Sequence, residues 1–324
     1  MSELKHHIVK TNGLDMHVAE AGAGPLVLLC HGWPEFWFSW RHQLAALAAA
    51  GYRAVAPDMR GYGQTSAPQD IAQYSILHLV GDMIGLVAAL GERSAIIVGH
   101  DWGAPVAWTS ALLRPDVFPA VVAMSVPHRA RGPAPPLAMI RAAGMENFYW
   151  IYFQQPGVAE KEFEADVGST MRRVLCGVFS NDGSRQGKHP LDLAPGAGML
   201  DHVAAPEQLP AWIDEATLAQ FVAEFRRTGF RGGLNWYRNI DRNWELTAPW
   251  QGATIRQPAL FIAGARDAVI RGVMGERALA ELPNVVPGLR KKIIIEGAGH
   301  WIQQERPAEV NAALLAFLSE VGKA

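Results

Sequence analysis

The sequence predicts an α/β protein in which a mostly parallel, doubly wound sheet is interrupted by an all-helical insertion. Two observations support this fold class. Short apolar runs of strand length alternate with longer segments of helical periodicity, first up to about residue 126 and again from residue 258. Between them, residues 131–245 show helical patterns and no convincing buried strand. Alternating strands and helices with parallel connections are typical of a doubly wound sheet.

The first part of the chain is predicted to contain a hairpin, four further strands and three helices. The hairpin turns at Asn12-Gly13, a dipeptide that favours tight turns between strands. The second helix has apolar residues in steps of three, one and four, and Gly91 ends it. In chain order these elements are a hairpin at 6–21, a strand at 26–30, a helix around Trp40 that Gly51 closes, a strand at 53–57, a helix at 76–90, a strand at 94–98, a helix at 104–113 and a strand at 119–126.

The middle of the chain is predicted to be a separate helical unit. It opens with a linker rich in Pro and Gly at 132–136. Helical patterns follow near 137–153, 158–166, 170–179, 214–228 and 233–245, and the Gly/Pro-rich stretch 181–211 is expected to be an irregular loop. We therefore predict a core at 1–130, a cap or lid at 131–245 and a second part of the core at 246–324. Such a cap would cover the carboxyl ends of the strands and exclude water there.

Composition narrows the function classes. The chain has 324 residues, 49% of them hydrophobic and 19% charged, and a net charge of −2. This balance suits a soluble globular protein and provides no basic surface for nucleic acid. There is no apolar run of 18 residues and no signal-peptide pattern at the start, so we expect no membrane span and a cytoplasmic location. Cys30 and Cys176 are expected to be buried thiols.

The five residues Gly-His-Asp-Trp-Gly at 99–103 carry the clearest chemical signal. They lie between a predicted strand and a predicted helix, where G-x-nucleophile-x-G forms a strained turn that exposes a reactive side chain. Serine usually occupies the central position, but here it is Asp101. With a reference pKa of about 3.9, an aspartate is already anionic at neutral pH and suits displacement at saturated carbon. The alternative is a Gly-flanked turn with a solvated Asp101.

Two further residues complete a catalytic triad in sequence order. Asp267 follows the apolar run 259–263, and His300 follows the apolar run 293–295. Nucleophile, acid and histidine occur in the order known for hydrolases with a nucleophile elbow, each at the end of a predicted strand. Taken alone, Asp267 could be an ordinary turn residue and His300 a surface histidine. The three together predict Asp101 as nucleophile, Asp267 as the acid and His300 as the base.

The residues His31, Gly32, Trp33 and Pro34 directly follow the strand at 26–30. A His-Gly motif at this place contributes a backbone N–H to an oxyanion hole, together with the residue after the nucleophile. We therefore predict Trp33 and Trp102 as the donors, each worth about 3 kcal/mol of transition-state stabilisation. Pro34 is a candidate for a cis peptide bond. A plain turn at the end of a strand is the alternative.

The predicted cap carries two segments that are both aromatic and polar, at 147–157 and 234–239. Attack of a carboxylate on a C–O bond produces an alkoxide, which is a poor leaving group and needs a proton donor. Tyrosine is such a donor, since its hydroxyl stays protonated to about pH 10. General acid assistance contributes about 10²–10⁴-fold. Packing of these tyrosines between helices, with their hydroxyls in water, is the alternative.

These motifs resemble those of the epoxide hydrolases of the α/β-hydrolase superfamily, close to the hydrolase domain of soluble epoxide hydrolases and their microbial relatives. The resemblance covers nearly the whole chain and implies an α/β-hydrolase fold with an inserted cap. It implies Asp101 as nucleophile, His300 as base, Asp267 as acid, and Tyr149 and Tyr237 as donors to the epoxide oxygen, whereas Tyr152 does not align with that role. It rests on HGWP at 31–34, GHDWGA at 99–104, YWIYFQQPGVAE at 149–160, FRGGLNWYRN at 230–239 and GAGHW at 297–301.

The resemblance also implies the reaction and its participants. A small apolar epoxide would be opened to a 1,2-diol through an alkyl ester on Asp101, and water activated by His300 would hydrolyse that ester without a metal or organic cofactor. The expected pocket comprises Trp102, Trp150, Phe153 and Trp301. The loop at 181–211 is longer and richer in Gly and Pro than the family pattern, which leaves pocket size and substrate preference open. Apolar cap surfaces can form the contact of a homodimer.

Three other functions share parts of this pattern. A haloalkane or haloacid dehalogenase uses the same Asp nucleophile and base but has no use for paired tyrosines. A non-catalytic ligand-binding member of the fold does not need an intact Asp–Asp–His set. A serine esterase is disfavoured because the elbow has no serine, and Ser125 lacks flanking glycines. Release of halide from chlorinated alkanes would favour a dehalogenase. Turnover of any epoxide would exclude a non-catalytic ligand-binding protein.

Overall fold

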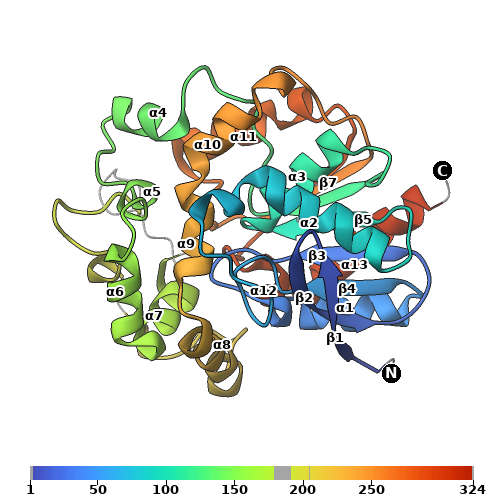
Figure 1. Ribbon diagram of the computed structural model, residues 1–324, viewed down its shortest axis with the longest axis horizontal. Coiled ribbons are helices and arrows are strands. Elements are labelled where there is room, and N and C mark those ends of the chain that lie inside the picture. The colour runs from blue at the N-terminus through green and yellow to red at the C-terminus, as the bar shows by residue number, and fades with distance from the viewer. Residues whose placement is uncertain (1–2, 179–190, 204, 323–324) are drawn as a thin grey trace.

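Eight strands form one sheet in the order β1-β2-β4-β3-β5-β6-β7-β8 (Figure 1). The computed structural model describes residues 3–178, 191–203 and 205–322. β1 and β2 are antiparallel, β2 is antiparallel to β4, and the remaining pairs are parallel. The strands are β1 (Lys5–Thr11), β2 (Leu14–Ala21), β3 (Leu26–Cys30), β4 (Arg53–Pro57), β5 (Ile96–His100), β6 (Val121–Met124), β7 (Ala259–Gly264) and β8 (Leu289–Ile295). The mostly parallel sheet is as predicted.

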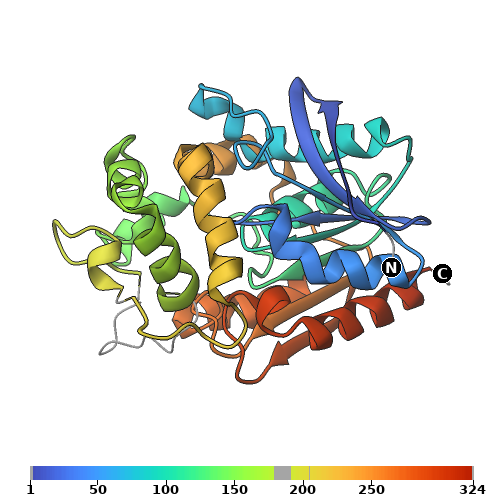
Figure 2. The ribbon, with the colours of Figure 1, turned by 90° about the horizontal axis from the view of Figure 1, so that it is seen from below.

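Side chains of the central strands alternate between two buried layers. In β3, Leu26 and Leu28 belong to one hydrophobic cluster, whereas Val27 and Leu29 belong to the other. Successive side chains of a strand point to opposite faces, so helices must cover both faces of a sheet with this pattern. α1 (Arg41–Ala49) and α13 (Pro307–Val321) cover one face; α2 (Ile76–Ala89), α3 (Gly103–Leu113) and α11 (Gly272–Val285) cover the other (Figures 1 and 2).

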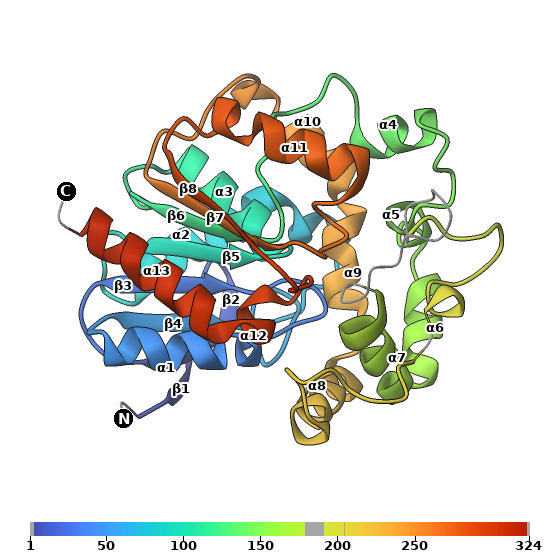
Figure 3. The ribbon, with the colours of Figure 1, turned by 180° about the vertical axis from the view of Figure 1, so that it is seen from behind.

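The chain between β6 and β7 is helical, as predicted. Within its described part, the strand-like pairing is an isolated bridge between Phe148 and Asp192. Its α-helices are α4 (Pro136–Ala142), α5 (Tyr149–Tyr152), α6 (Val158–Ala165), α7 (Val167–Arg173), α8 (Glu215–Thr228), α9 (Arg231–Arg238) and α10 (Ile240–Leu246). They lie beyond the end of the sheet at which β7 and β8 finish, with α9 between α5–α7 and the sheet (Figures 1 and 3). The domain limits at residues 131 and 245 stay a prediction.

Short turns complete the helical elements. Single helical turns lie at Trp37–Trp40, Ile71–Tyr74, Val174–Val178, Leu200–His202 and Ala248–Trp250, and α12 (Ile302–Glu305) precedes α13. Residues 181–190 and 204 of the predicted irregular loop lie outside the described residues, as does residue 179, the last residue of the helix predicted at 170–179. Among the residues that the structure does describe, no helix combines the length and the apolarity needed to cross a membrane.

Three predicted helices are broken or shifted, each for a local reason. The helix predicted at 137–153 is divided into α4 and α5 because Gly144 takes a positive φ of 79° and ends α4. The helix predicted at 233–245 is two helices separated at Asn239, whose side chain bonds the carbonyls of Ile71 and Asn235. The helix predicted at 170–179 starts earlier, because Asp166 accepts a hydrogen bond from the Ser169 N–H and caps α7.

The boundaries of two predicted strands also differ. β5 begins at Ile96 and runs to His100, two residues further than the strand predicted at 94–98. β6 covers only Val121–Met124 of the strand predicted at 119–126, and Ser125 directly after it takes a positive φ of 68°. Both strands therefore end at the residues that lead into the candidate site.

Candidate active site

Asp101 lies in the sharp turn between β5 and α3. It adopts a positive φ of 49°, which is unusual for a residue other than glycine. Gly99 allows the turn to close, because a Cβ there would lie 2.0 Å from the carbonyl oxygen of Gly103. The Asp101 side chain is 13% exposed. The strained turn thus holds a carboxylate at the carboxyl end of a central strand, as the elbow pattern predicts.

His300 lies between two carboxylates. Its Nδ1 is 3.0 Å from Oδ1 of Asp267, and its Nε2 is 3.4 Å from Oδ2 of Asp101. His300 follows β8 and Asp267 follows β7, and both side chains are fully buried. Because the bond from Nδ1 to Asp267 fixes the ring, Nε2 faces Asp101. The structure therefore brings together the three residues of the predicted triad.

The turn after β3 approaches the same carboxylate. The Trp33 N–H donates to Oδ1 of Asp101 at 2.8 Å, and the Trp33–Pro34 peptide bond is cis, as predicted. Gly32 is required here, since a Cβ would lie 2.3 Å from that oxygen. Trp102 immediately precedes α3, where the first N–H groups have no partner within the helix. Trp33 thus meets the geometry of the predicted oxyanion hole, and the role of Trp102 stays a prediction.

His31, the first residue of the motif, has a supporting position. Its Nδ1 faces the Gly32 carbonyl at 2.9 Å, and its Nε2 accepts the Met59 N–H at 2.9 Å. The ring is fully buried, and burial lowers its pKa. His31 therefore holds the turn after β3 against the loop that follows β4.

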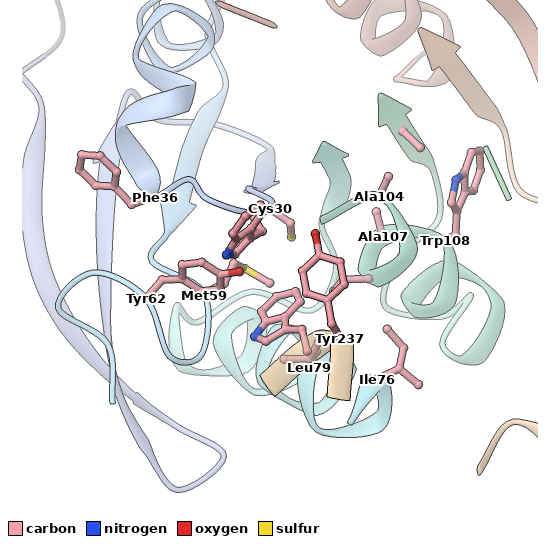
Figure 4. Packing of buried hydrophobic residues seen from close by; sticks show 14 of the residues in the cluster. Cys30, Phe36, Met59, Tyr62, Ile76, Leu79, Ala104, Ala107, Trp108 and Tyr237 are labelled. Carbon is pink, nitrogen blue, oxygen red and sulfur yellow. The ribbon is translucent and has the colours of Figure 1, made fainter. Parts of the chain in front are cut away.

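Two tyrosines of the cap project toward this site. Tyr149 lies on α5 and Tyr237 on α9, and their ring centroids are 5.8 Å apart. The Tyr237 ring also lies 5.1 Å from Trp102 and 5.8 Å from Trp33, the two residues beside Asp101. Figure 4 shows the hydroxyl of Tyr237 directed away from α9, among side chains of the core. The cap therefore places two phenols together above the elbow.

Both phenols stay protonated at neutral pH. Burial raises the pKa of Tyr149, and the negative charge of Asp101 raises it further. The pKa of Tyr237 is raised well above its usual value by burial, by Tyr149 and by Asp101. Each hydroxyl is therefore a hydrogen-bond donor within the electric field of the carboxylate.

The other predicted pocket residues surround these phenols to different degrees. The Phe153 ring packs against Tyr149 and Tyr237, with centroids 5.4 Å and 4.9 Å away. Trp301 lies beside His300, and its indole N–H donates to the Leu175 carbonyl in the cap at 2.7 Å. Trp150 is half-buried and packs near Phe148 and Tyr149, farther from the elbow. Lining of a substrate pocket by these three side chains and by Trp102 stays a prediction.

Tyr152 and Ser125 contribute in other ways. The Tyr152 hydroxyl donates to Oε2 of Glu162 at 2.8 Å, so it is bound within the cap. The Ser125 hydroxyl donates to the carbonyl of His300 at 2.8 Å. Ser125 therefore supports the backbone of the histidine and is not placed as a nucleophile.

Comparisons with known proteins agree on one family. The family model described as the alpha/beta hydrolase fold matches residues 25–176. Epoxide hydrolase A of Mycobacterium tuberculosis is 48% identical over 316 residues, which cover 96% of each chain. The epoxide hydrolase of Caballeronia sordidicola is 42% identical, with 98% of this chain and 94% of the relative covered. The chain belongs to the epoxide hydrolases of the α/β-hydrolase fold.

Solved structures of epoxide hydrolases share the architecture described above. The crystal structure of epoxide hydrolase A from Mycobacterium thermoresistibile matches with a TM-score of 0.92 and 46% identity, over 98% of both chains. An epoxide hydrolase from an endophytic Streptomyces matches with a TM-score of 0.93 and 47% identity, over 99% of this chain and 97% of that one. The match extends through the cap as well as the core.

The sequence analysis missed a buried pair behind the triad of this epoxide hydrolase. Oε2 of Glu35 accepts the Gly32 N–H at 2.9 Å and faces Nδ1 of His100 at 2.8 Å. Nε2 of His100 lies 2.8 Å from the carbonyl oxygen of His300. Glu35 and His100 therefore connect the turn after β3 with the backbone of His300. The available signal was their position: Glu35 directly follows the motif at 31–34, and His100 lies within the motif at 99–103, at the end of an apolar strand.

The sequence analysis also did not single out Tyr62. It lies in the loop after β4 and is buried, and its hydroxyl has no hydrogen-bond partner among the residues described. Burial, and then the charge of Asp101, raise its pKa well above the usual value. In Figure 4 the hydroxyl points to the middle of the cluster that contains Tyr237. Its glycine neighbours, Gly61 and Gly63, were the available sequence signal.

The protonation of His300 leads to a pH prediction for the enzyme. Burial lowers the pKa of His300, but the charges of Asp267 and Asp101 outweigh this effect and raise it to about 10. The imidazolium is therefore paired with carboxylates in the free enzyme. The stability from this pairing is complete below the unfolded-state pKa of about 6.5 and is lost as the pH rises through about 10.

We expect kcat/KM to fall as the pH rises through about 10, because kcat/KM reports on the free enzyme. The predicted ester on Asp101 would remove the charge of that carboxylate and lower the pKa of His300, so we expect the acid limb of the kcat profile well below that value. Steady-state pH profiles of kcat/KM and of kcat, recorded with one epoxide, measure these two limbs. An alkaline limb of kcat/KM near pH 6.5 would contradict the pairing of His300 with Asp101.

Proposed function

We propose that the enzyme opens an epoxide to a 1,2-diol in two half-reactions centred on Asp101. In the first, a carboxylate oxygen of Asp101 attacks an epoxide ring carbon and the C–O bond on the opposite side breaks. Tyr149 and Tyr237 hold the epoxide oxygen, which receives a proton that the imidazolium of His300 ultimately supplies. The products of this step are an alkyl ester of Asp101 with a free hydroxyl and a neutral His300.

The second half-reaction hydrolyses the ester. Nε2 of His300, oriented by Asp267, takes a proton from water, and the resulting hydroxide attacks the acyl carbon of Asp101. The N–H groups of Trp33 and Trp102 stabilise the tetrahedral oxyanion. Collapse releases the diol and restores the Asp101 carboxylate beside the His300 imidazolium. One water is consumed, protons balance, and only side chains, backbone N–H groups and water take part.

One observation favours epoxides over halides as substrates. Two buried, protonated phenols lie 5.8 Å apart at their ring centroids above a nucleophilic carboxylate. A halide leaves as a stable anion, whereas the oxygen of an epoxide leaves as an alkoxide and needs hydrogen-bond donors. The aromatic surroundings of the phenols, with Phe153 packed against both, suit a small apolar epoxide. We also propose a cytoplasmic location and a homodimer that forms through apolar surfaces of the cap.

The Tyr149→Phe and Tyr237→Phe variants test the role of the phenols. Each removes one donor without changing the ring, and we expect the alkylation rate with styrene oxide to fall about 10²-fold, within the range for general acid assistance. The rate of ester hydrolysis should stay near that of the wild type. Tyr152→Phe is the matched control, because that hydroxyl bonds Glu162 within the cap.

Substrate choice provides the complementary measurement. Wild-type protein is incubated with styrene, stilbene and fatty-acid epoxides and, in parallel, with chlorinated alkanes. We expect diol formation from at least one epoxide and no halide release. Halide release from a chlorinated alkane, with all the epoxides left intact, would favour a dehalogenase instead.

A further inference from the structure

Helix α9, which carries Tyr237, is fixed directly to the core. A Cβ on Gly232 would lie 1.9 Å from the carbonyl oxygen of Gly61, so helix and core loop meet backbone to backbone. The Trp236 indole donates to the Arg60 carbonyl at 3.0 Å. Arg60 itself is buried in an ion pair with Asp82, at 2.6 Å. Tyr237 therefore occupies a place that the core determines.

The other phenol has a different attachment. Tyr149 begins α5, which lies on the far side of α9 from the sheet (Figures 1 and 3). The backbone N–H of Tyr149 donates to the Leu191 carbonyl at 3.0 Å, and this bond lies within the cap. The position of Tyr149 relative to Tyr237 consequently depends on what joins α5 to α9.

Arg238, the residue after Tyr237, makes that connection. Its Nε donates to the carbonyl of Phe153, the residue that directly follows α5, at 3.1 Å. Its Nη atoms form an ion pair with Glu160 of α6 at 2.8 Å and 2.9 Å, and Nη1 also donates to Asn235 at 2.9 Å. The side chain of Arg238 is 3% exposed and that of Glu160 is 12% exposed, so the pair is shielded from solvent.

Gln154 also connects α5 with α9, and a hydrogen bond within the start of α6 supports Glu160. The Gln154 side chain donates to the carbonyls of Trp150 in α5 and Tyr237 in α9, at 2.7 Å and 3.1 Å. Oε2 of Glu160 accepts the Gly157 N–H at 2.9 Å, which ties the start of α6 to the same pair. Burial raises the pKa of Glu160, but the hydrogen bonds from Arg238 and from backbone N–H groups, together with the charge of Arg238, lower it by more in sum, so the carboxylate stays charged.

We propose that Arg238, paired with Glu160, is a positioning residue that sets the place of Tyr149 relative to Tyr237 during epoxide opening. The proposal rests on the function proposed above. Two hydroxyls on different elements must reach one epoxide oxygen, and a misplacement of about 1 Å can cost about 10²-fold in rate. The guanidinium suits this task because its planar fork binds a carboxylate with two atoms and still reaches a carbonyl.

The proposal separates the two half-reactions. Alkylation needs both phenols, whereas ester hydrolysis needs His300, Asp267 and the oxyanion N–H groups, all of which belong to the core. Loss of the Arg238 contacts should therefore slow alkylation and leave hydrolysis unchanged. A merely structural role, in which the cap loosens or the protein unfolds in part, would affect both rates or the amount of active enzyme.

The test is Arg238→Gln, with Glu160→Gln as a milder second variant that keeps the shape of the side chain. Wild-type and variant proteins are mixed with excess styrene oxide, quenched in acid at successive times, and the fraction of esterified protein is measured by mass spectrometry. We expect alkylation to be at least tenfold slower for Arg238→Gln and about threefold slower for Glu160→Gln. Hydrolysis rates should stay within twofold of the wild type.

Arg173→Gln is the matched control. Arg173 also ends a cap helix and donates to two carbonyls, those of Leu200 and Val203, at 2.9 Å and 2.8 Å, but it does not contact α5 or α9 through these bonds. Both rates of this variant should equal those of the wild type. Unchanged alkylation in both the Arg238 and Glu160 variants, or an equal fall of both rates, would overturn the proposal.

Tyr149→Phe, measured in parallel, separates this inference from the function on which it rests. If Tyr149→Phe slows alkylation and Arg238→Gln does not, only the positioning role is wrong. If Tyr149→Phe leaves alkylation unchanged, the proposed role of the phenols is wrong and the positioning role falls with it. If Arg238→Gln does not fold, the alkylation and hydrolysis rates of Glu160→Gln are compared with those of the wild type instead. The same outcomes then support or overturn the positioning role.

Discussion

Asp101→Ala is expected to lower the turnover of an epoxide by about 10⁴-fold or more, the scale seen when a covalent nucleophile is removed. The reason is geometric as well as chemical. Asp101 is the residue that the elbow turn presents, and one of its oxygens is aligned by the Trp33 N–H while the other faces His300. The substitution keeps the turn and the base but removes the atom that bonds to the substrate.

Initial rates of diol formation measure this effect. Asp116→Ala is the control, since Asp116 is an exposed carboxylate paired with Arg114 and should leave the rate unchanged. A single turnover of excess wild-type enzyme in heavy-oxygen water tests the covalent route itself. We expect the first diol to carry an ordinary oxygen from Asp101, and solvent oxygen in that first diol would refute the ester.

His300→Gln is expected to trap the ester and to lower steady-state turnover by about 10⁴-fold. Gln retains polar atoms near Asp101 and Asp267 but cannot take a proton from water, so the second half-reaction stops. Alkylation continues more slowly, because the phenols still donate to the epoxide oxygen. The two half-reactions should therefore separate in this variant.

Mass spectrometry of the intact protein measures the trapped species. After incubation with an epoxide, the His300→Gln protein should gain the mass of one substrate molecule, and the gain should be absent in a variant that also carries Asp101→Ala. His78→Gln is the control, since His78 bonds Ser75 at 2.8 Å on another part of the core. Steady-state turnover near the wild-type rate would rule out His300 as the base.

The geometry of the candidate site in the core could be predicted because it depends on local patterns. A strand, a Gly-flanked turn and a helix determine where Asp101 lies, and the ends of parallel strands meet at one edge of a sheet. Asp267 and His300 each follow such a strand, so their meeting follows from the fold class alone. Trp33 could be predicted for the same reason, as the residue after a strand end and a glycine.

The cap was harder to predict, because its helices are short and end on individual side chains. Gly144 breaks one predicted helix, and Asn239 breaks another by bonding the carbonyl of Ile71 in the core. Periodicity carries no information about such contacts. The limits of β5 and β6 shifted for a related reason, since strand ends depend on neighbouring strands as well as on apolar runs.

The sequence by itself determined the fold class, the chain order of Asp101, Asp267 and His300, and the presence of a carboxylate at the elbow, since each follows from residue type and spacing along the chain. Only the tertiary structure decided which aromatic side chains meet above Asp101, and that Glu35 and His100 lie behind His300 while Arg238 joins α5 to α9. Such contacts join residues far apart in sequence, and their geometry is set by the packing of whole helices against the sheet.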